Sequence, residues 1–446
     1  MAASNRSRTT GIAVLGCGIV GAGVVDGLLH DTALIRQRAG VTLELRHVVE
    51  KSPERIQQTG VPAKLVRAGL APVLKDQQTH VVVELFGGLE PARTFVLQAI
   101  KAGKHIVTAN NYLLATHGRE IFAAAQKAGV CVQFEASCGG AIPIIKALSQ
   151  SLLANDISRV VGIVNGTCNY ILTQMTVHGQ SYADALAGAQ AAGFAERDPT
   201  FDVNGTDSAH KLAIMSALAF GADVPFSKIE IAGIDKLSDI DLKFAREFGY
   251  VCKLLAIGEK LSTTAEDQSK IKNPAISLRV HPTFVSQDNL LAHVHGSFNA
   301  ISVTGHRAGE TLYYGRGAGG TPTSSAVLAD VIDIALGTAP LLFQRLPLLA
   351  KRRPLPFVPT SHIVSRNYLR VTALDVPGVM AQIANILGKH HISLAGINQH
   401  ESKAGQSVPI VITTHEAKEG HVTQALAEID QLKSITANTV RIRVLG

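Results

Sequence analysis

The sequence has no tryptophan, only five cysteines, and no apolar run that approaches the roughly 20 residues needed to span a bilayer. The cysteines are odd in number and show no C-x-x-C spacing, so neither a disulfide framework nor a zinc site follows from them. Residues 1–10 are polar and basic with no apolar segment behind them, which is typical of a disordered tail and not of a secretory signal. We therefore expect a cytoplasmic protein without a membrane partner.

Charge gives little support to nucleic-acid binding. The net charge is +7, but the basic residues are scattered and do not form a stripe interleaved with aromatic side chains.

A chain of 446 residues with 46% hydrophobic residues and 40 glycines is long enough for two or three domains, each with its own core. The composition is typical of a globular enzyme that acts on a small molecule.

The first 135 residues alternate between strands and helices. Apolar strands are predicted at 12–15, 43–49, 81–85, 106–108 and 130–134, and helices are predicted to end near residue 29 and to cover 92–102 and 119–127. Alternation at this spacing predicts an α/β fold with a Rossmann-type, doubly wound parallel sheet. We assign residues 1–135 to this nucleotide-binding domain.

A G-x-G-x-x-G sequence lies between the first strand and the first helix. It consists of Gly16, Gly18 and Gly21, with Ile19 and Val20 between the last two glycines, and a helix follows. Glycines let the backbone approach a pyrophosphate, and the helix N-terminus stabilises the negative charge. A glycine-rich turn without a ligand is the alternative.

Glu50 ends the second strand, where a carboxylate can bind the ribose diol of NAD. Lys51 and Arg55 follow at once and could hold the 2′-phosphate of NADP, and the spacing from Gly21 is longer than usual. The choice between NAD and NADP stays open.

Beyond residue 135 the pattern changes. We predict an α+β substrate domain at 136–320, with strands at 157–164, 250–257, 276–280 and 292–304 and helices at 169–177, 181–192 and 205–220. A helix within 321–340 is expected to return to the first domain, and prolines mark a linker at 341–360. Residues 361–446 read β-α-β-β-α-β, the ferredoxin-like order. We expect this part to be an independent module that either dimerises or senses a ligand.

Residues 196–211 combine four carboxylates with one lysine, in a chain that is only 17% charged. Asp207 and Lys211 are four residues apart, so they share a face of a helix that begins near residue 205. Glu196, Asp198 and Asp202 belong to the loop before it. This arrangement suits a small substrate that has a cationic amine and a group needing a proton. A solvated loop followed by a surface ion pair is the alternative.

Taken together, the motifs resemble those of homoserine dehydrogenases along nearly the whole chain, in the order of that family. They lie at 16–21, 104–110, 135–146, 165–172, 196–211 and 315–323, and residues 374–379 resemble an ACT domain. The resemblance implies NAD(P)-dependent interconversion of L-aspartate 4-semialdehyde and L-homoserine, in threonine and methionine biosynthesis. It also implies a homodimer or homotetramer with threonine as an effector of the ACT module. We expect the stand-alone form, without the aspartate kinase fused to some relatives.

The resemblance also implies roles for single residues. Lys211 matches the family's acid/base lysine, and Asp207 would hold it or the substrate hydroxyl. Substrate binding is implied for four positions: Glu196 and Asp202, which match partners of the ammonium group, and Asn165 and Thr167. Cofactor contacts are implied for Thr108, Asn110, Asn111 and Gly317. A sodium site is implied for Glu135 with the carbonyls of Cys138, Gly140 and Ile142, although a plain turn would have the same residues.

Asn111 departs from the family pattern, which has a lysine at this place. Asparagine can donate a hydrogen bond but supplies no charge, and losing a group that stabilises an oxyanion costs ~10²–10³ in rate. A catalytically weak or inactive nucleotide and amino-acid sensor is therefore the main alternative function. Asn111 could also simply cap the following helix. A prephenate dehydrogenase is disfavoured, because a dicarboxylate substrate needs arginines where this chain has aspartates.

Overall fold

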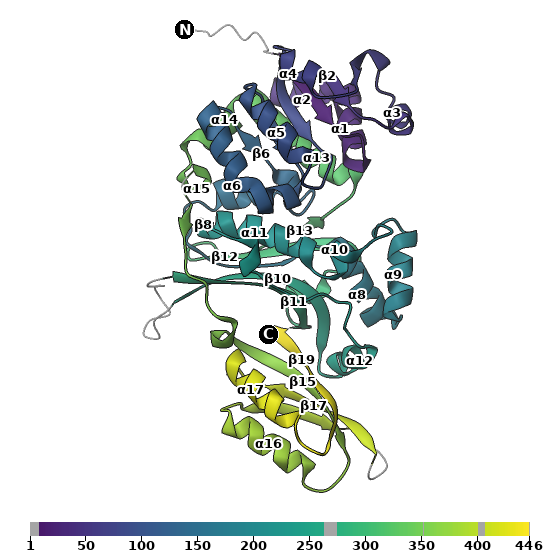
Figure 1. Ribbon diagram of the computed structural model, residues 1–446, viewed down its shortest axis with the longest axis vertical. Helices are drawn as coiled ribbons and strands as arrows, with labels where there is room; N and C mark the ends of the chain where they lie inside the picture. Colours follow the sequence, from purple (N-terminus) through teal and green to yellow (C-terminus); the bar gives the residue numbers. More distant parts are fainter. Residues whose placement is uncertain (1–8, 263–273, 351, 400–405, 446) are drawn as a thin grey trace. The chain divides into compact units, whose positions relative to one another are not determined.

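The computed structural model describes residues 9–262, 274–350, 352–399 and 406–445, so most of the tail predicted at residues 1–10 lies outside the described part. The chain forms two compact units, each built from three separate stretches. Figure 1 labels the helices and strands along the chain. Unit 1 contains Met1–Val164, Asp207–Ile229 and Ser297–Pro354. Unit 2 contains Asn165–Thr206, Glu230–Gly296 and Leu355–Gly446.

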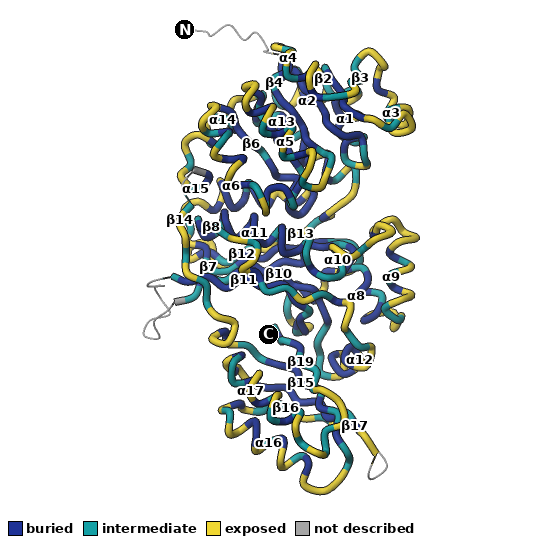
Figure 2. The backbone as a smooth tube through the Cα atoms, viewed as in Figure 1, coloured by how far each residue is buried: buried dark blue, intermediate teal, exposed yellow. Residues whose placement is uncertain are grey.

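Unit 1 contains the predicted parallel sheet. Its strands are β1 (Thr9–Leu15), β2 (Thr42–Val49), β3 (Val66–Arg67), β4 (Thr79–Glu84), β5 (His105–Thr108) and β6 (Val132–Gln133), in the order β3-β2-β1-β4-β5-β6. All neighbouring strands are parallel. This order is that of dinucleotide-binding domains, which confirms the Rossmann-type prediction. The central strands are buried because helices cover the sheet (Figure 2).

The helices of this domain follow the strands. They are α1 (Ile19–His30), α2 (Thr32–Ala39), α3 (Pro53–Thr59), α4 (Ala71–Lys75), α5 (Ala92–Lys101) and α6 (Asn111–Ala128). The helix predicted within 321–340 is α13 (Gly320–Leu336), and it packs on α1 as expected. Gly27 permits this close packing, because a Cβ there would lie 2.5 Å from Leu328. The helix predicted at 119–127 begins earlier, at Asn111, because Asn110 caps it.

The rest of unit 1 includes an antiparallel sheet of β7 (Ile157–Ile163), β12 (Phe298–Gly305) and β13 (Gly309–Arg316). Helices α7 (Ile144–Lys146), α11 (Thr206–Phe220), α14 (Thr338–Arg345) and α15 (Pro347–Ala350) and the short strands β8 (Ala222–Asp223) and β14 (Arg353–Pro354) accompany it. The strand predicted at 292–304 begins only at Phe298, after a 3-10 turn. The predicted linker at 341–360 contains helical residues of α14 and α15, since prolines 340 and 347 stand in first turns, where proline is tolerated.

Unit 2 is built on two long antiparallel strands, β10 (Tyr250–Ser262) and β11 (Pro274–Ser286). Strand β9 (Glu230–Ile231) runs parallel to β11. The helices are α8 (Gly166–His178), α9 (Tyr182–Ala191), α10 (Thr200–Val203) and α12 (Asp239–Glu247).

The C-terminal module has the predicted ferredoxin-like order. It consists of β15 (Val364–Leu374), α16 (Val379–Lys389), β16 (Leu394–Gln399), β17 (Ser407–Thr414), β18 (Ala417–Lys418), α17 (Glu419–Ile429) and β19 (Ile435–Leu445). Its sheet order is β19-β15-β17-β16, and its core includes the fully buried Leu369, Ile383 and Ile412.

Strand β19 also pairs with β11, in parallel, from Thr283 opposite Arg443 to Val285 opposite Leu445. The module therefore continues the sheet of β10 and β11, which differs from the independent module predicted from the sequence. Pairing satisfies backbone groups at two strand edges that would otherwise be open.

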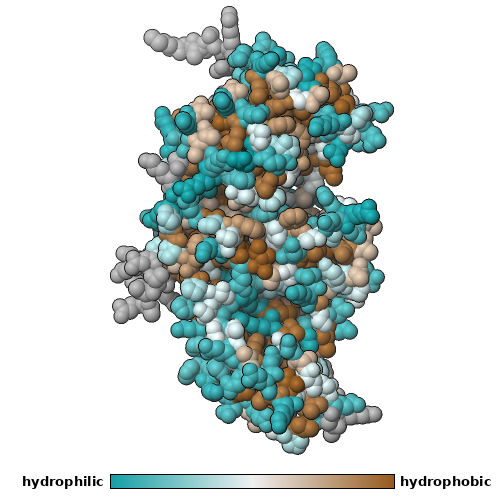
Figure 3. Space-filling model, viewed as in Figure 1, coloured by the Kyte–Doolittle hydropathy of each residue, from teal (hydrophilic) through white to brown (hydrophobic). Residues whose placement is uncertain are grey.

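No single described helix is long and apolar enough to cross a membrane, although α13 and α14, bent by 84° at their junction, reach that length and composition as a pair. Exposed large apolar residues are spread over both units, among them Ile19, Tyr314 and Ile397. Hydrophilic and hydrophobic residues are mixed over the face seen in Figure 3.

Candidate active site

The three glycines of the loop after β1 have different surroundings. Gly16 has φ +97°, and a Cβ there would lie 3.0 Å from the Leu85 carbonyl oxygen. A Cβ on Gly21 would lie 2.0 Å from the Gly16 carbonyl oxygen. Gly18 has no atom within 4 Å of its Cβ position, so no protein contact requires it. Gly18 is therefore an open position between two packed glycines, and it precedes a helix that has no side-chain cap. A pyrophosphate can approach the backbone closely at such a place.

Glu50 is held by the same loop. Its Oε2 accepts from the Cys17 N–H at 2.8 Å, and its Oε1 accepts from the N–H groups of Lys51 at 2.7 Å and Ser52 at 2.9 Å. Burial favours a higher pKa for Glu50, but the three N–H donors outweigh it and lower the pKa. The carboxylate is therefore ionised, with one acceptor position left for a ribose hydroxyl. Arg55 lies 3.7 Å from it and is more than half exposed.

A buried carboxylate that sequence reasoning missed lies at the ends of β4 and β5. Glu84 is fully buried, and burial raises its pKa. Its Oε2 accepts from Thr108 Oγ1 at 2.7 Å, and Thr108 Oγ1 accepts from the Asn110 N–H at 3.0 Å. Asn110 also caps α6 through Leu113 and donates to the Gly88 carbonyl at 2.7 Å. Thr108 and Asn110 therefore shape the carboxyl edge of the sheet, where such folds bind ligands.

Asn111, Asp207 and Lys211 lie together in unit 1. Lys211 Nζ is 2.6 Å from Asp207 Oδ2 and donates to the Val164 carbonyl at 2.9 Å. Asn111 Nδ2 donates to the other carboxylate oxygen, Oδ1, at 2.8 Å. The shared helix face predicted for Asp207 and Lys211 is confirmed. The capping alternative for Asn111 is wrong, because Asn110 is the cap and the Asn111 side chain contacts Asp207.

These three side chains are only partly accessible. The Lys211 and Asp207 side chains are 13% and 20% exposed. Their ion pair is therefore less screened than one on an open surface. A lysine that is paired with the Asp207 carboxylate and is partly accessible is suited to give or take a proton from a bound molecule.

In unit 2, Asn165 and Asp202 are joined. Asn165 caps α8 by accepting from the Cys168 N–H at 2.8 Å, and its amide Nδ2 donates to Asp202 Oδ1 at 2.7 Å. Asn165 thus fixes the orientation of a carboxylate on α10. Thr167 Oγ1 donates to the Phe194 carbonyl at 2.6 Å, so its hydroxyl proton is already used.

Two other carboxylates of the acidic segment differ from Asp202. Glu196 is exposed, and its backbone carbonyl accepts from Gln190. Asp198 accepts from both the side chain and the backbone N–H of Thr200, which lowers its pKa. Asp198 therefore stabilises the start of α10.

The predicted sodium ligands surround a tight turn in unit 1. The Glu135 carboxylate accepts from the N–H groups of Ile145 at 2.8 Å and Lys146 at 2.9 Å, and burial raises its pKa to about 7. Gly139 and Gly140, with φ +72° and +55°, turn the chain between Cys138 and Ile142. Among the described residues, no group of three or more His, Cys, Asp or Glu side chains is arranged to hold a metal ion.

Close packing against backbone at Gly140 and against a side chain at Gly317 explains two of the predicted glycines. A Cβ on Gly140 would lie 2.6 Å from the Gly317 carbonyl, and one on Gly317 would lie 2.0 Å from the Asn299 amide carbon. Sequence reasoning also missed Asp330, which accepts from the Glu135 N–H at 2.9 Å.

Comparisons with known proteins cover nearly all of the chain. Family models match for "Homoserine dehydrogenase, NAD binding domain" at residues 16–135, "Homoserine dehydrogenase" at 143–332 and "ACT domain" at 367–434. Homoserine dehydrogenase of Neisseria gonorrhoeae is 42% identical over 98% of this chain and 99% of its own length. The Pseudomonas aeruginosa enzyme is 40% identical over 97% and 98%. The crystal structure of a homoserine dehydrogenase from Thiobacillus denitrificans superposes with a TM-score of 0.90, at 40% identity over 98% of both chains.

Proposed function

The chain belongs to the homoserine dehydrogenase family, and from this premise we propose that Lys211 moves the proton of its reaction. The enzyme is an NAD(P)-dependent oxidoreductase that interconverts L-aspartate 4-semialdehyde and L-homoserine. The observation that carries the proposal is the position of Asp207 between Lys211 and Asn111, with one carboxylate oxygen on each.

In the oxidation of homoserine, neutral Lys211 takes the proton of the substrate hydroxyl. In the reverse direction its ammonium gives that proton to the aldehyde oxygen as the alcohol forms. Asp207 and the Val164 carbonyl hold Nζ in place, which lowers the entropy lost in reaching the reactive geometry. Asn111 fixes Asp207, so its amide acts on the lysine through the carboxylate.

We propose that Glu196 and Asp202 bind the ammonium group of the substrate. Asp202 is five residues before Asp207 in the chain, and Asn165 orients its carboxylate. The exposed Glu196 is free to reorient as the substrate binds. Thr167 would contribute through its hydroxyl lone pairs, because its proton is donated to Phe194.

The residues present fit a nicotinamide dinucleotide. Gly16, Gly18 and Gly21 would hold its pyrophosphate beside Ile19 and Val20, and Glu50 would bind a ribose hydroxyl. Thr108, Asn110, Asn111 and Gly317 would line the nicotinamide end. When bound, the cofactor supplies or accepts the hydride. The choice between NAD and NADP depends on the balance between the ionised Glu50 and the cations Lys51 and Arg55, and initial rates with each cofactor measure it.

Sodium is proposed at Glu135 and the carbonyls of Cys138, Gly140 and Ile142. A cation there would favour the ionised carboxylate, which burial disfavours. Its presence should raise the melting temperature in sodium chloride above that in potassium chloride at equal ionic strength.

The functional division proposed is 1–135 for the cofactor, 136–320 for substrate and catalysis, 321–340 for the returning helix, 341–360 for the linker and 361–446 for regulation. We propose threonine as effector of the ACT module and a homodimer or homotetramer as the assembly. The open edge strand β13, with Leu312 36% and Tyr314 56% exposed, supports an assembly through this edge. Five buried free thiols support a cytoplasmic location.

The direct test is turnover of L-aspartate semialdehyde with NADH or NADPH, with and without threonine. Light scattering of the same sample measures the assembly. Absence of turnover by a folded, cofactor-binding protein would contradict the proposed role of Lys211 and favour the sensor alternative.

A further inference from the structure

Two aromatic rings flank the candidate proton-transfer residues in the sequence and meet each other in unit 1. Tyr112 directly follows Asn111 at the start of α6. His210 directly precedes Lys211 on α11. The rings of Tyr112 and His210 are stacked, with centroids 4.7 Å apart and planes at 15° to each other. The proposed catalytic chemistry uses neither ring.

His210 is an uncharged ring in aromatic surroundings. The residue is 3% exposed, and besides Tyr112 it contacts Phe226, with ring centroids 4.7 Å apart and planes at 38°. Burial lowers the pKa of the His210 imidazole, against the opposing effect of the Asp207 carboxylate. The neutral ring therefore packs as an aromatic side chain and brings no second cation to Lys211.

The ring stack lies beside the hydrogen bond between Asn111 and Asp207. On α11, Asp207 and His210 are three residues apart, so they lie on one face of the helix. On α6, Asn111 and Tyr112 are neighbours in the first turn. The amide–carboxylate hydrogen bond and the ring stack are therefore adjacent contacts between the same two helices, and both depend on how closely these helices approach each other.

Beyond the stack, the two helices line a pocket of about 280 Å³. Leu114 and Gly118 of α6 contribute to it, together with Ala213 and Ala217 of α11 and the ring of Phe226. A pocket of this size leaves these side chains without the close packing of a protein interior. Near Lys211, the approach of α6 to α11 therefore depends on the hydrogen bond and on the ring stack.

We propose that His210 and Tyr112 are positioning residues for the proton transfer. Their stack sets the separation of α6 and α11 at which the Asn111 amide reaches Asp207. The Asp207 carboxylate in turn holds Lys211 Nζ, at 2.6 Å. The role assigned to the rings rests on the proposed role of Lys211 in moving the proton.

Two matched pairs of variants separate the ring from its volume. His210→Leu and Tyr112→Leu remove a ring but keep a large apolar side chain, whereas His210→Phe and Tyr112→Phe keep a ring. The measurement is the single-turnover rate of reduced cofactor formation at saturating homoserine, because it reports the chemical step without product release. Each leucine variant should lower this rate about threefold to tenfold, the equivalent of one aromatic pair, with little change in KM. Each phenylalanine variant should stay within about twofold of the wild type.

A second substitution shows whether the stack acts through Asn111. In an Asn111→Ala background the hydrogen bond to Asp207 is already absent, so adding His210→Leu should lower the rate by less than about twofold. A ring that only stabilises the fold would lower the rate equally in both backgrounds, and equal losses would overturn the proposal. Wild-type rates in both His210→Leu and Tyr112→Leu would overturn it as well.

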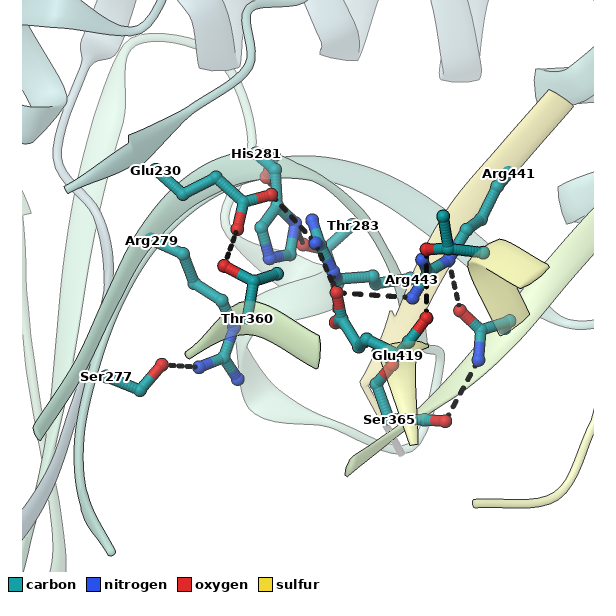
Figure 4. Close-up of polar contacts among 12 residues, drawn as sticks. Glu230, Ser277, Arg279, His281, Thr283, Thr360, Ser365, Glu419, Arg441 and Arg443 are labelled. Atoms are coloured by element: carbon teal, nitrogen blue, oxygen red, sulfur yellow. Dashed lines mark hydrogen bonds and ion pairs between the residues drawn. The ribbon is translucent and has the colours of Figure 1, made fainter. Parts of the chain in front are cut away.

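A control variant in unit 2 separates loss of rate from loss of stability. Glu419 accepts from Arg443 at 2.5 and 2.6 Å, and Arg443 also donates to Glu230 at 2.9 Å (Figure 4). Glu419 is buried, so Glu419→Gln weakens a buried ion pair and should lower the melting temperature. The single-turnover rate should stay at the wild-type value. A rate loss in Glu419→Gln equal to that in His210→Leu would assign both losses to stability and contradict the positioning role.

Lys211→Ala distinguishes this inference from the proposed function. If Lys211→Ala keeps more than about a tenth of the rate, the proton-transfer role of Lys211 fails, and the role of the rings fails with it. If Lys211→Ala loses the rate while His210→Leu and Tyr112→Leu keep it, the rings have no positioning role and the proposed function stands.

Discussion

Replacing Asn111 with lysine is expected to move the acidic limb of the pH–rate profile for homoserine oxidation to lower pH. Asn111 Nδ2 and Lys211 Nζ bind the two oxygens of Asp207, at 2.8 and 2.6 Å. A lysine at 111 brings a second ammonium group to the same carboxylate. Because like charges repel, protonated Lys211 becomes less favourable, and the neutral form that takes the hydroxyl proton is populated at lower pH.

The size of the displacement follows from the geometry. Two cations on opposite oxygens of one carboxylate are roughly 5 Å apart, which gives ~3 kcal/mol at an effective dielectric of 20 and ~0.8 kcal/mol in water. The Lys211 and Asp207 side chains are 13% and 20% exposed, so the screening is intermediate. Since 1.36 kcal/mol corresponds to one pH unit, we expect a displacement of about one unit. Below the limb, kcat should rise up to about tenfold.

The assay is the initial rate of reduced cofactor formation at saturating homoserine across the titration range. Asn111→Met is the matched control, because it has nearly the length of lysine without the charge. A limb that stays in place in Asn111→Lys would refute the electrostatic coupling between positions 111 and 211. An equal displacement in Asn111→Met would show that losing the hydrogen bond to Asp207 is the cause. A lower kcat in both variants would mean that the asparagine amide is needed to hold Asp207.

Four further substitutions or truncations have expected outcomes. Lys211→Ala should lower kcat by ~10²–10⁴ with little change in KM, and retention of more than about a tenth of kcat would remove Lys211 from proton transfer. Glu196→Gln should raise the KM for homoserine, and unchanged kinetics would exclude it from substrate binding. Truncation after Pro354 should lower the melting temperature as well as abolish the response to an effector, because it removes β19, which pairs with β11; an unchanged melting temperature would contradict this. Burial lowers the pKa of Lys253 from 10.5 to about 8, so the unfolded chain binds the Lys253 proton more tightly than the folded chain does. The free energy of unfolding should therefore increase as the pH rises from about 8 to 10.5. Lys253→Met should abolish that rise in urea unfolding at several pH values, whereas an unchanged rise would exclude Lys253 as its source.

Much of the fold could be predicted because its signals are local. Continuous apolar runs such as 81–83 indicate buried parallel strands, and the order of elements after residue 361 is visible in the sequence. The pairing of β11 with β19 could not be predicted in this way. This pairing depends on which strands have an unpaired edge, one in the C-terminal module and one in the rest of unit 2. Hydrophobic periodicity shows which face of a strand is buried, but it does not show which edge finds a partner.

In the candidate site too, contacts between residues close in the sequence could be predicted, and contacts between distant residues could not. The i,i+4 spacing of Asp207 and Lys211 predicts their contact, because helix geometry alone determines it. The contact between Asn111 and Asp207 joins positions 96 residues apart and depends on how α6 and α11 pack. Glu84 was missed because a glutamate at a strand end is usually solvated. Its burial depends on the neighbouring strand, which supplies Thr108.

The interleaving of the two units sets an order of events during synthesis on the ribosome. The last stretch of unit 1 ends at Pro354, whereas unit 2 needs β19, at Ile435–Leu445. Strand β11 is made long before β19, so the Thr283–Val285 part of β11 lacks its β19 partner while the intervening residues emerge. During this interval a strand from a neighbouring nascent chain can compete for the same edge. We therefore expect substitutions in β19 to lower the yield of folded protein more than the activity of each folded molecule.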